Sequence, residues 1–137
     1  MTCMTGNQAI ARGAYEAGVR VATSHPGHPC SEVLETIVNF PEIYSEWSIS
    51  EKVALEVAIG ASIAGSRAIC ILKNVGLNVA ADPLLLFSLT GVGSGLVVVV
   101  ADDIGIVMSP SEQDDRYYPE NRIIRTLFSI YSKIFQK

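Results

Sequence analysis

The chain has 137 residues, 49% of them hydrophobic, and a formal net charge of −4 at pH 7. That length supplies one hydrophobic core and hence one domain, and an acidic chain without a clustered basic face is not expected to bind nucleic acid. The three cysteines form no CxxC pair, so they predict reduced thiols in a cytoplasmic protein and no zinc site.

Segments of helical and strand-like composition alternate along the chain. Gly18 follows the first helix where a C-terminal glycine belongs, and Ser31 can cap the second helix, which Pro41 ends. The predicted elements are a helix at 8–17, a strand at 19–23, a helix from Ser31, a strand at 43–49, a helix at 50–64, a strand at 68–72, a helix at 78–89 and a strand at 96–101. This order predicts an α/β fold of three layers, a parallel sheet with helices on both faces.

Residues 83–101 form an uncharged run that is long enough to suggest a membrane span. Pro83 and the glycines at 91, 93 and 95 divide the run into a helical piece and a β-branched piece. Buried parallel strands are continuous apolar runs because helices cover both faces of the sheet. We therefore predict a helix, a turn and a strand here, and no membrane span.

Four loops carry the candidate ligand-binding positions. Ligands of open parallel sheets bind beyond the carboxyl ends of the strands, and the loops that follow the predicted strands are 25–30, 48–51, 73–78 and 102–116. The charges at 102, 103 and 112–116 look like metal ligands, but we interpret them as loop structure and substrate-side contacts. The sequence predicts no metal site in this domain.

Long, ordered stretches of the sequence are similar to one enzyme family. They include GNQAIARGAYEAGV at 6–19, EKVALEVAIGAS at 51–62, VGLNVAADPL at 75–84 and VVADD at 99–103. Across residues 6–118 the chain resembles the 2-oxoacid:ferredoxin oxidoreductases, most closely the large subunit of the indolepyruvate enzymes. The resemblance implies that residues 1–118 are the N-terminal pyrimidine-binding domain of a thiamine-diphosphate enzyme. Such an enzyme decarboxylates an aryl pyruvate, passes the acyl unit to coenzyme A and sends electrons through iron–sulfur clusters to ferredoxin.

Glu51 is the catalytic residue that this resemblance implies. In thiamine enzymes a carboxyl group after a strand, at the start of a helix, hydrogen bonds to N1′ of the aminopyrimidine and shares a proton with the ring. Glu51 precedes the small residues Ala54 and Ala58, which fits that pattern. Ser48-Ile49-Ser50-Glu51 also matches a Ser-x-x-Glu capping box, in which Glu51 would only cap the helix.

The resemblance assigns further positions in the other loops. Pro26, Gly27, Gly76 and Asn78 would bind the cofactor, because a glycine permits a ring or a carboxylate to approach the backbone closely. His28, Asn74 and Arg116 would contact the substrate. A protonated His28 could donate to a carboxylate, or it could be an exposed loop residue, and Arg116 could pair with a carboxylate in bidentate fashion. Cys30 would be activated if it opened a helix, and is otherwise a small turn residue.

The family implies partners that this chain does not supply. Magnesium and [4Fe–4S] clusters are expected on other domains, because no Gly-Asp-Gly segment and no series of cluster-binding cysteines is present. The expected partners are a diphosphate-binding domain or subunit, a smaller oxidoreductase subunit and, indirectly, ferredoxin, in a homo- or hetero-oligomer. The chain alone would be inactive.

Residues 119–137 depart from the family. Their composition suggests a truncated or frameshifted product, or a helix with one apolar face that covers the sheet or docks a partner. Two other functions stay open: the small subunit of a sulfopyruvate- or phosphonopyruvate-type decarboxylase, and a non-catalytic interaction protein.

Overall fold

The computed structural model describes residues 3–105, 112–120 and 128–131 of the chain. Its helices are α1 (Gly6–Glu16), α2 (Ser31–Ile37), α3 (Glu51–Ile63), α4 (Asn74–Val79), α5 (Ala81–Thr90) and α6 (Tyr117–Glu120). Its strands are β1 (Val21–Ser24), β2 (Tyr44–Trp47), β3 (Ala68–Lys73), β4 (Leu96–Asp102) and β5 (Phe128–Tyr131).

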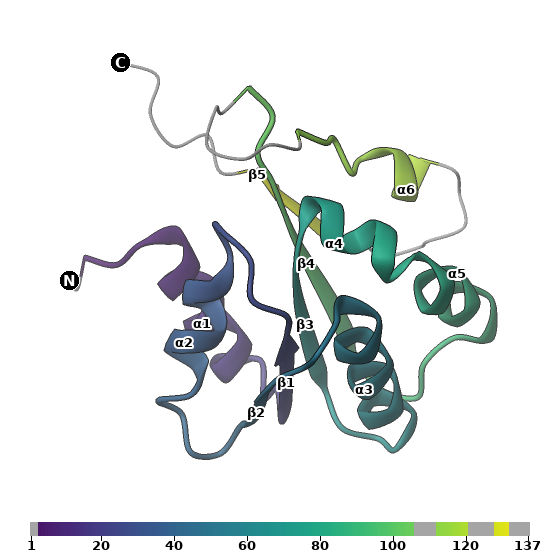
Figure 1. The fold of residues 1–137 in the computed structure, drawn as a ribbon. Helices are drawn as coiled ribbons and strands as arrows, with labels where there is room; N and C mark the ends of the chain where they lie inside the picture. Colours follow the sequence, from purple (N-terminus) through teal and green to yellow (C-terminus); the bar gives the residue numbers. More distant parts are fainter. Residues whose placement is uncertain (1–2, 106–111, 121–127, 132–137) are drawn as a thin grey trace.

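The strands form one parallel sheet in the order β2-β1-β3-β4-β5. Helices α1 and α2 cover one face of the sheet, and α3, α4 and α5 cover the other (Figure 1). The predicted α/β fold of three layers is therefore confirmed. Because all strands run in the same direction, their carboxyl ends meet at one edge of the sheet.

The central strand β3 explains why both faces of the sheet are covered. Ile69 and Ile71 point to the α1–α2 layer, whereas Ala68, Cys70 and Leu72 point to the α3–α5 layer. Successive side chains of a strand alternate between faces, so a continuous apolar run needs a helical layer on each side. The two resulting cores consist largely of fully buried aliphatic side chains.

Helix starts and ends follow local chemistry in most cases. Thr5 and Gln8 form a capping box at α1, in which the Thr5 side chain accepts from the Gln8 amide and the Gln8 side chain accepts from the Thr5 amide. Gly18 and Gly65, just beyond α1 and α3, have φ values of 73° and 93°. That left-handed conformation favours glycine, so both positions end their helices, and the prediction for Gly18 is confirmed.

Three predictions about local structure are wrong. Ser31 does not cap α2 but is its first residue, and its hydroxyl bonds back to Gly27. The helix ends at Ile37, before Pro41. The helix predicted at 78–89 is two helices, because Pro83 has no N–H to donate to the carbonyl of Val79, and the chain breaks between α4 and α5.

The C-terminal segment also differs from its prediction. Residues 128–131 form the edge strand β5, parallel to β4, and not part of a helix. A strand is favoured there because β4 would otherwise leave its backbone groups unpaired at the edge of the sheet. Residues 121–127 and 132–137 of the predicted helix lie outside the described residues. Within the described ranges, every helix is too short or too polar to cross a membrane.

Candidate functional site

The structure brings the predicted loops together at the carboxyl edge of the sheet. His25, after β1, pairs through Nδ1 with the carbonyl of Ser48, after β2, at 3.0 Å. Gly27 packs against Lys73 at the end of β3, where an added β-carbon would lie 3.0 Å from Lys73 Cβ. Three segments far apart in the sequence thus meet at this edge, as the parallel topology predicts.

Glu51 is the first residue of α3 and follows β2 directly. Ser50 is the N-cap residue, and its hydroxyl accepts from the Val53 amide at 3.4 Å. The Ser48 hydroxyl instead donates to Glu46 Oε1 at 3.1 Å. The capping-box interpretation of Ser48 and Glu51 is therefore wrong, because Glu51 stands two positions too early in the helix to reach back to the cap.

The Glu51 side chain lies against the backbone of α4. A β-carbon added at Gly76 would lie 2.7 Å from Glu51 Cγ and 2.9 Å from Glu51 Oε1, closer than real β-carbons come. Gly76 thus permits a carboxylate to approach the backbone, and that carboxylate belongs to the chain itself. The side chain of Glu51 is half-buried, and among the described residues its carboxylate has no hydrogen-bond or ion-pair partner.

The loop between β1 and α2 is held by its own hydrogen bonds. The Gly27 amide donates to Ser31 Oγ at 3.0 Å, and this hydroxyl donates to the Gly27 carbonyl at 2.9 Å. Pro26 and His28 are exposed, whereas Cys30 is buried. Burial raises the pKa of the Cys30 thiol to about 11, so the thiol is not activated although Cys30 stands at the start of α2.

The two asparagines of the third loop already have partners within the chain. Asn74 is fully buried and donates through Nδ2 to Asp103, which follows β4. Asn78 exchanges hydrogen bonds with Gln113, from Nδ2 to Gln113 Oε1 at 2.7 Å and from Gln113 Nε2 to Asn78 Oδ1 at 3.1 Å. Tyr118 donates to the same Oδ1 at 2.9 Å. These contacts hold residues 112–118 against α4.

Arg116 binds a neighbouring carboxylate. Its Nε donates to Asp114 Oδ1 at 2.7 Å, and its Nη2 lies 2.5 Å from Asp114 Oδ2. The pair lowers the pKa of the Asp114 carboxyl, chiefly through these hydrogen bonds. Arg116 is exposed, so a substrate carboxylate would have to compete with Asp114 for the guanidinium group.

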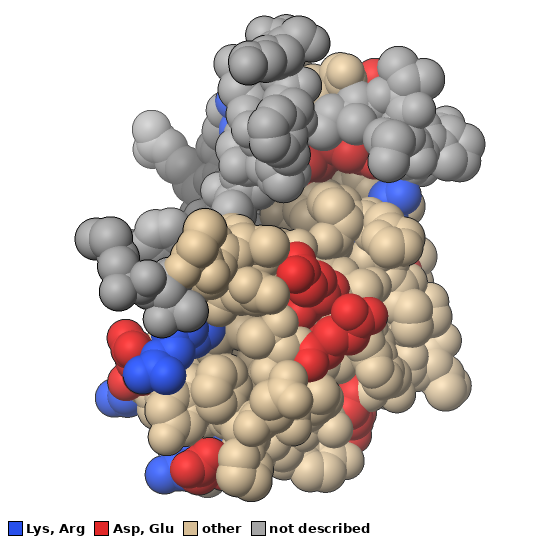
Figure 2. Space-filling model, turned by 90° about the vertical axis from the view of Figure 1, so that its left-hand side faces the viewer, with Lys and Arg blue, Asp and Glu red and all other residues tan. Residues whose placement is uncertain are grey.

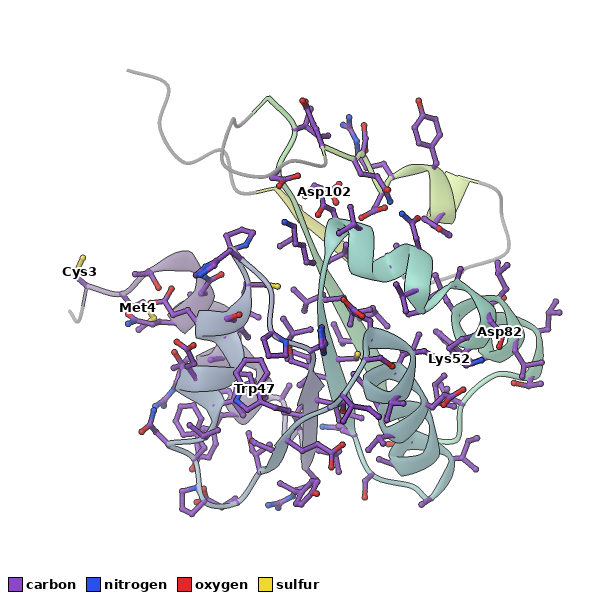
Figure 3. All side chains as sticks on the ribbon, in the orientation of Figure 1. Cys3, Met4, Trp47, Lys52, Asp82 and Asp102 are labelled. Carbon is purple, nitrogen blue, oxygen red and sulfur yellow. The ribbon has the colours of Figure 1, made fainter. Side chains whose placement is uncertain are left out.

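Sequence reasoning missed a buried carboxyl pair at the end of β4. The Asp115 amide donates to Oδ2 of Asp102, which is labelled in Figure 3, at a distance of 3.0 Å. Their side chains are only 5% and 2% exposed. The acidic composition of 102–116 was the available signal, but only the fold shows which two carboxyl groups meet. In the ranges that the structure describes, no three His, Cys, Asp or Glu side chains gather to hold a metal ion.

Two surfaces lie away from this edge. A hollow of about 370 Å³ at the amino ends of β1 and β2 is lined by Tyr15, Glu16, Gly18, Val19, Arg20 and Glu42, none of which is a predicted site residue. On the face seen in Figure 2, acidic side chains run across the middle of the molecule, and basic side chains lie at the left and at the upper right. Between α3 and α5, Lys52 and Asp82 form an exposed ion pair of 2.7 Å (Figure 3).

Comparison with known proteins identifies the relatives of this chain. The indolepyruvate oxidoreductase subunit IorA of Archaeoglobus fulgidus is 48% identical over 122 residues, with 84% of this chain and 20% of that subunit covered. IorA of Pyrococcus abyssi is 48% identical over 116 residues, with 82% and 18% covered. The chain is a homologue of part of IorA. It spans about one fifth of the length of these relatives, and no family model matches it.

A solved structure supports the fold independently. The 2-oxoglutarate:ferredoxin oxidoreductase of Magnetococcus marinus, with 2-oxoglutarate, coenzyme A and succinyl-CoA bound, superposes with a TM-score of 0.72 at 22% identity. The match covers 83% of this chain and 21% of the other. The predicted resemblance to the 2-oxoacid:ferredoxin oxidoreductases is confirmed, and the decarboxylase-type alternative is not favoured by these relatives.

Proposed function

We propose that residues 1–118 act as the pyrimidine-binding domain of a thiamine-diphosphate-dependent 2-oxoacid:ferredoxin oxidoreductase of the indolepyruvate type. The observation that carries the proposal is the placement of Glu51. Its half-buried carboxylate lies at the carboxyl edge of the sheet, packs on Gly76 and has no partner in the described part of the chain. The identity to IorA supports the same assignment.

The environment of Glu51 suits an aminopyrimidine ring. When bound, thiamine diphosphate supplies the carbon nucleophile that attacks a 2-oxo acid, and its ring nitrogen N1′ can share a proton with a carboxyl group. Glu51 would share that proton. Its carboxylate accepts no hydrogen bond from the described part of the chain, so it is free to accept a hydrogen bond from a ligand. The close contact with Gly76 restricts where the carboxylate can stand, which orients it before the ligand arrives.

The remaining loop residues would serve positioning and substrate contact. Pro26 and Gly27 would border the ring, and His28 would face the substrate from its exposed position in the same loop. The amides of Asn74 and Asn78 are engaged by Asp103 and Gln113, so we expect them to support the site by holding its loops. A substrate role for Arg116 would require its guanidinium to leave Asp114.

A complete enzyme would need further parts. We propose that a diphosphate-binding domain or subunit supplies magnesium coordination, and that [4Fe–4S] clusters and a smaller subunit carry electrons to ferredoxin. Half of the cofactor site would then come from this domain. We therefore expect the purified chain to bind thiamine diphosphate weakly, and tight, magnesium-dependent binding measured by calorimetry would contradict this division of the site.

The test is Glu51→Gln, made after residues 1–118 replace the matching region of P. abyssi IorA. Gln keeps the size of the side chain and can still hydrogen bond to N1′, but it cannot share a proton with the ring. Cofactor affinity should change little, while hydrogen–deuterium exchange at the thiazolium C2 slows by about 10²–10⁴, the usual contribution of a positioned acid or base.

The matched control is Glu56→Gln, on the exposed side of the same helix. It removes the same charge from α3 without touching the site, so its exchange rate should equal that of the parent. If Glu51→Gln also exchanges at the parent rate with cofactor bound, Glu51 is not the catalytic carboxyl.

A further inference from the structure

Residues 112–118, which we call the strap, are tied to two elements of the domain by one chain of hydrogen bonds. At one end the Asp115 amide donates to Asp102 Oδ2 at the end of β4. In the middle Gln113 donates to Asp115 Oδ1. At the other end Gln113 and Tyr118 both bond to Asn78 of α4. The strap thus bridges the end of β4 and α4.

The bridge contains two carboxyl groups, each of which has one oxygen without a hydrogen-bond partner among the described residues. Asp102 and Asp115 are almost fully buried, the Asp115 amide donates to Asp102 Oδ2, and a hydrogen bond between the two side chains contributes to the raised pKa of Asp115. In the described part of the chain, Asp102 Oδ1 and Asp115 Oδ2 have no hydrogen-bond partner. Two ionised carboxylates cannot bond to each other, because neither carries a hydrogen, and burial makes their repulsion costly.

The surrounding charges do not neutralise the pair. Asp103 adds a further carboxylate beside Asp102 and interacts with Asn74 and with Lys73 Nζ, at 4.0 Å. Asp114, next to Asp115, carries its charge in the pair with Arg116. Among the described residues, neither Asp102 nor Asp115 has an ion-pair partner.

Three other polar residues belong to the elements around the pair. Tyr118 of the strap has its pKa raised by burial and by Asp115. On α4, Asn78 is polar but does not titrate. On β5, the backbone partner of Asp102 is Tyr131. None of these described neighbours offers a positive charge to the two carboxyl groups.

We propose that Asp102 and Asp115 share one proton and that this proton fastens the strap to the end of β4. The shared proton turns the repulsive contact into an O–H···O bond, in which one of the two unpartnered oxygens donates and the other accepts. Burial, followed by the hydrogen bond with Asp102 and the charges of Asp102 and Asp114, raises the pKa of Asp115 to about 7. The aspartic-acid pairs of proteases share a proton for the same reason.

The proton links strap opening to pH in one direction. An opened strap exposes Asp115 to water and returns its pKa toward the ordinary value of 3.8, so opening releases the proton. The opening equilibrium should therefore rise as the pH increases between those two values, by up to about tenfold per pH unit for one proton. Above the pKa of the closed state it should level off.

Carbon-13 NMR of aspartate-labelled chain tests the shared proton directly. We expect one carboxyl resonance of the Asp102–Asp115 pair to titrate near neutral pH, and the titration to disappear in both Asp115→Asn and Asp102→Asn. Asp114→Asn is the matched control, because it removes a charge from the same strap but leaves the pair, so the titration should remain. If every aspartate in the parent chain titrates below pH 5, the proposal is wrong.

Amide hydrogen exchange tests the fastening. After correction for intrinsic exchange rates, strap opening should increase by up to about 100-fold from pH 5 to pH 7 in the parent and in Asp114→Asn. Strap opening should be independent of pH in Asp115→Asn, because the side-chain amide of the new asparagine donates to Asp102 at every pH. A parent strap that opens equally at both pH values would overturn the proposal.

A bound cation is the competing explanation for the unpartnered oxygens, and the same experiments separate the two. Magnesium or calcium, added at millimolar concentration, should leave the titration and the exchange rates unchanged. A titration midpoint that shifts with either metal, or a strap that EDTA opens, would assign the site to a cation and overturn the shared proton.

Discussion

Substitution of Gly76 by Ala should move the Glu51 carboxylate while leaving the fold intact. An alanine in a helix interior is worth about 0.5–1 kcal/mol relative to glycine, and Gly76 is the third residue of α4. The added β-carbon would come within 2.7 Å of Glu51 Cγ, so the side chain must leave its rotamer, at a cost of about 0.5–1.5 kcal/mol. The two effects are of similar size, and the net change in stability should be close to zero.

Gly60→Ala provides the matched control. Gly60 is an exposed residue of the last turn of α3, and apart from the helix's own backbone and the adjacent residues no atom lies within 4 Å of a β-carbon added there. The helix-propensity gain should therefore appear in full, as a stabilisation of about 0.5–1 kcal/mol. Both variants can be measured by urea denaturation of the 137-residue chain.

A double-mutant cycle with Glu51→Ala isolates the contact. With the carboxylate gone, Gly76→Ala should stabilise the chain as much as Gly60→Ala does, which gives a coupling energy of about 1 kcal/mol between positions 51 and 76. Gly60→Ala should show no coupling to position 51. The reasoning is refuted if Gly76→Ala is equally stabilising with Glu51 present and absent, because the carboxylate would then not lie against the glycine.

Two further predictions concern α3 and the thiols. Ser50→Ala should lower the free energy of unfolding by about 0.5–1 kcal/mol in urea denaturation, at the low end for a helix cap because its hydrogen bond is 3.4 Å long. Ser48→Ala should lower it by less. Equal losses would support the capping-box interpretation of Ser48 and Glu51. Burial raises the pKa of Cys30 to about 11 and that of Cys70 to about 12, so a thiol reagent at pH 8 should label the exposed Cys3 rapidly and the other two only after unfolding. Rapid labelling of Cys30 in the native chain would contradict its burial.

The sequence predicted the layers of this fold because each layer follows from a local pattern. The apolar run at 96–101 required cover on both faces, and Gly18 marked a helix end. Where a pattern was compatible with two interpretations, the local sequence could not decide between them. The Ser-x-x-Glu match at Ser48 failed because Ser50, two residues later, provides the cap.

The candidate site divides in the same way. Sequence similarity and strand order were sufficient to place Glu51 and Gly76 at one edge of the sheet, since the carboxyl ends of parallel strands must meet there. Their close contact could not be predicted, because it depends on how α3 and α4 pack across the end of the sheet.

The acidic residues at 102–103 and 112–115 show what only the tertiary structure decided. Composition indicated an acidic loop, and it could not distinguish Asp114, paired with Arg116 at the surface, from Asp115, buried against Asp102. Adjacent residues of one type differ here because burial and the distance to a second carboxyl depend on chain segments far apart in sequence. Those two quantities raise the pKa of Asp115, whereas Arg116 lowers the pKa of the adjacent Asp114.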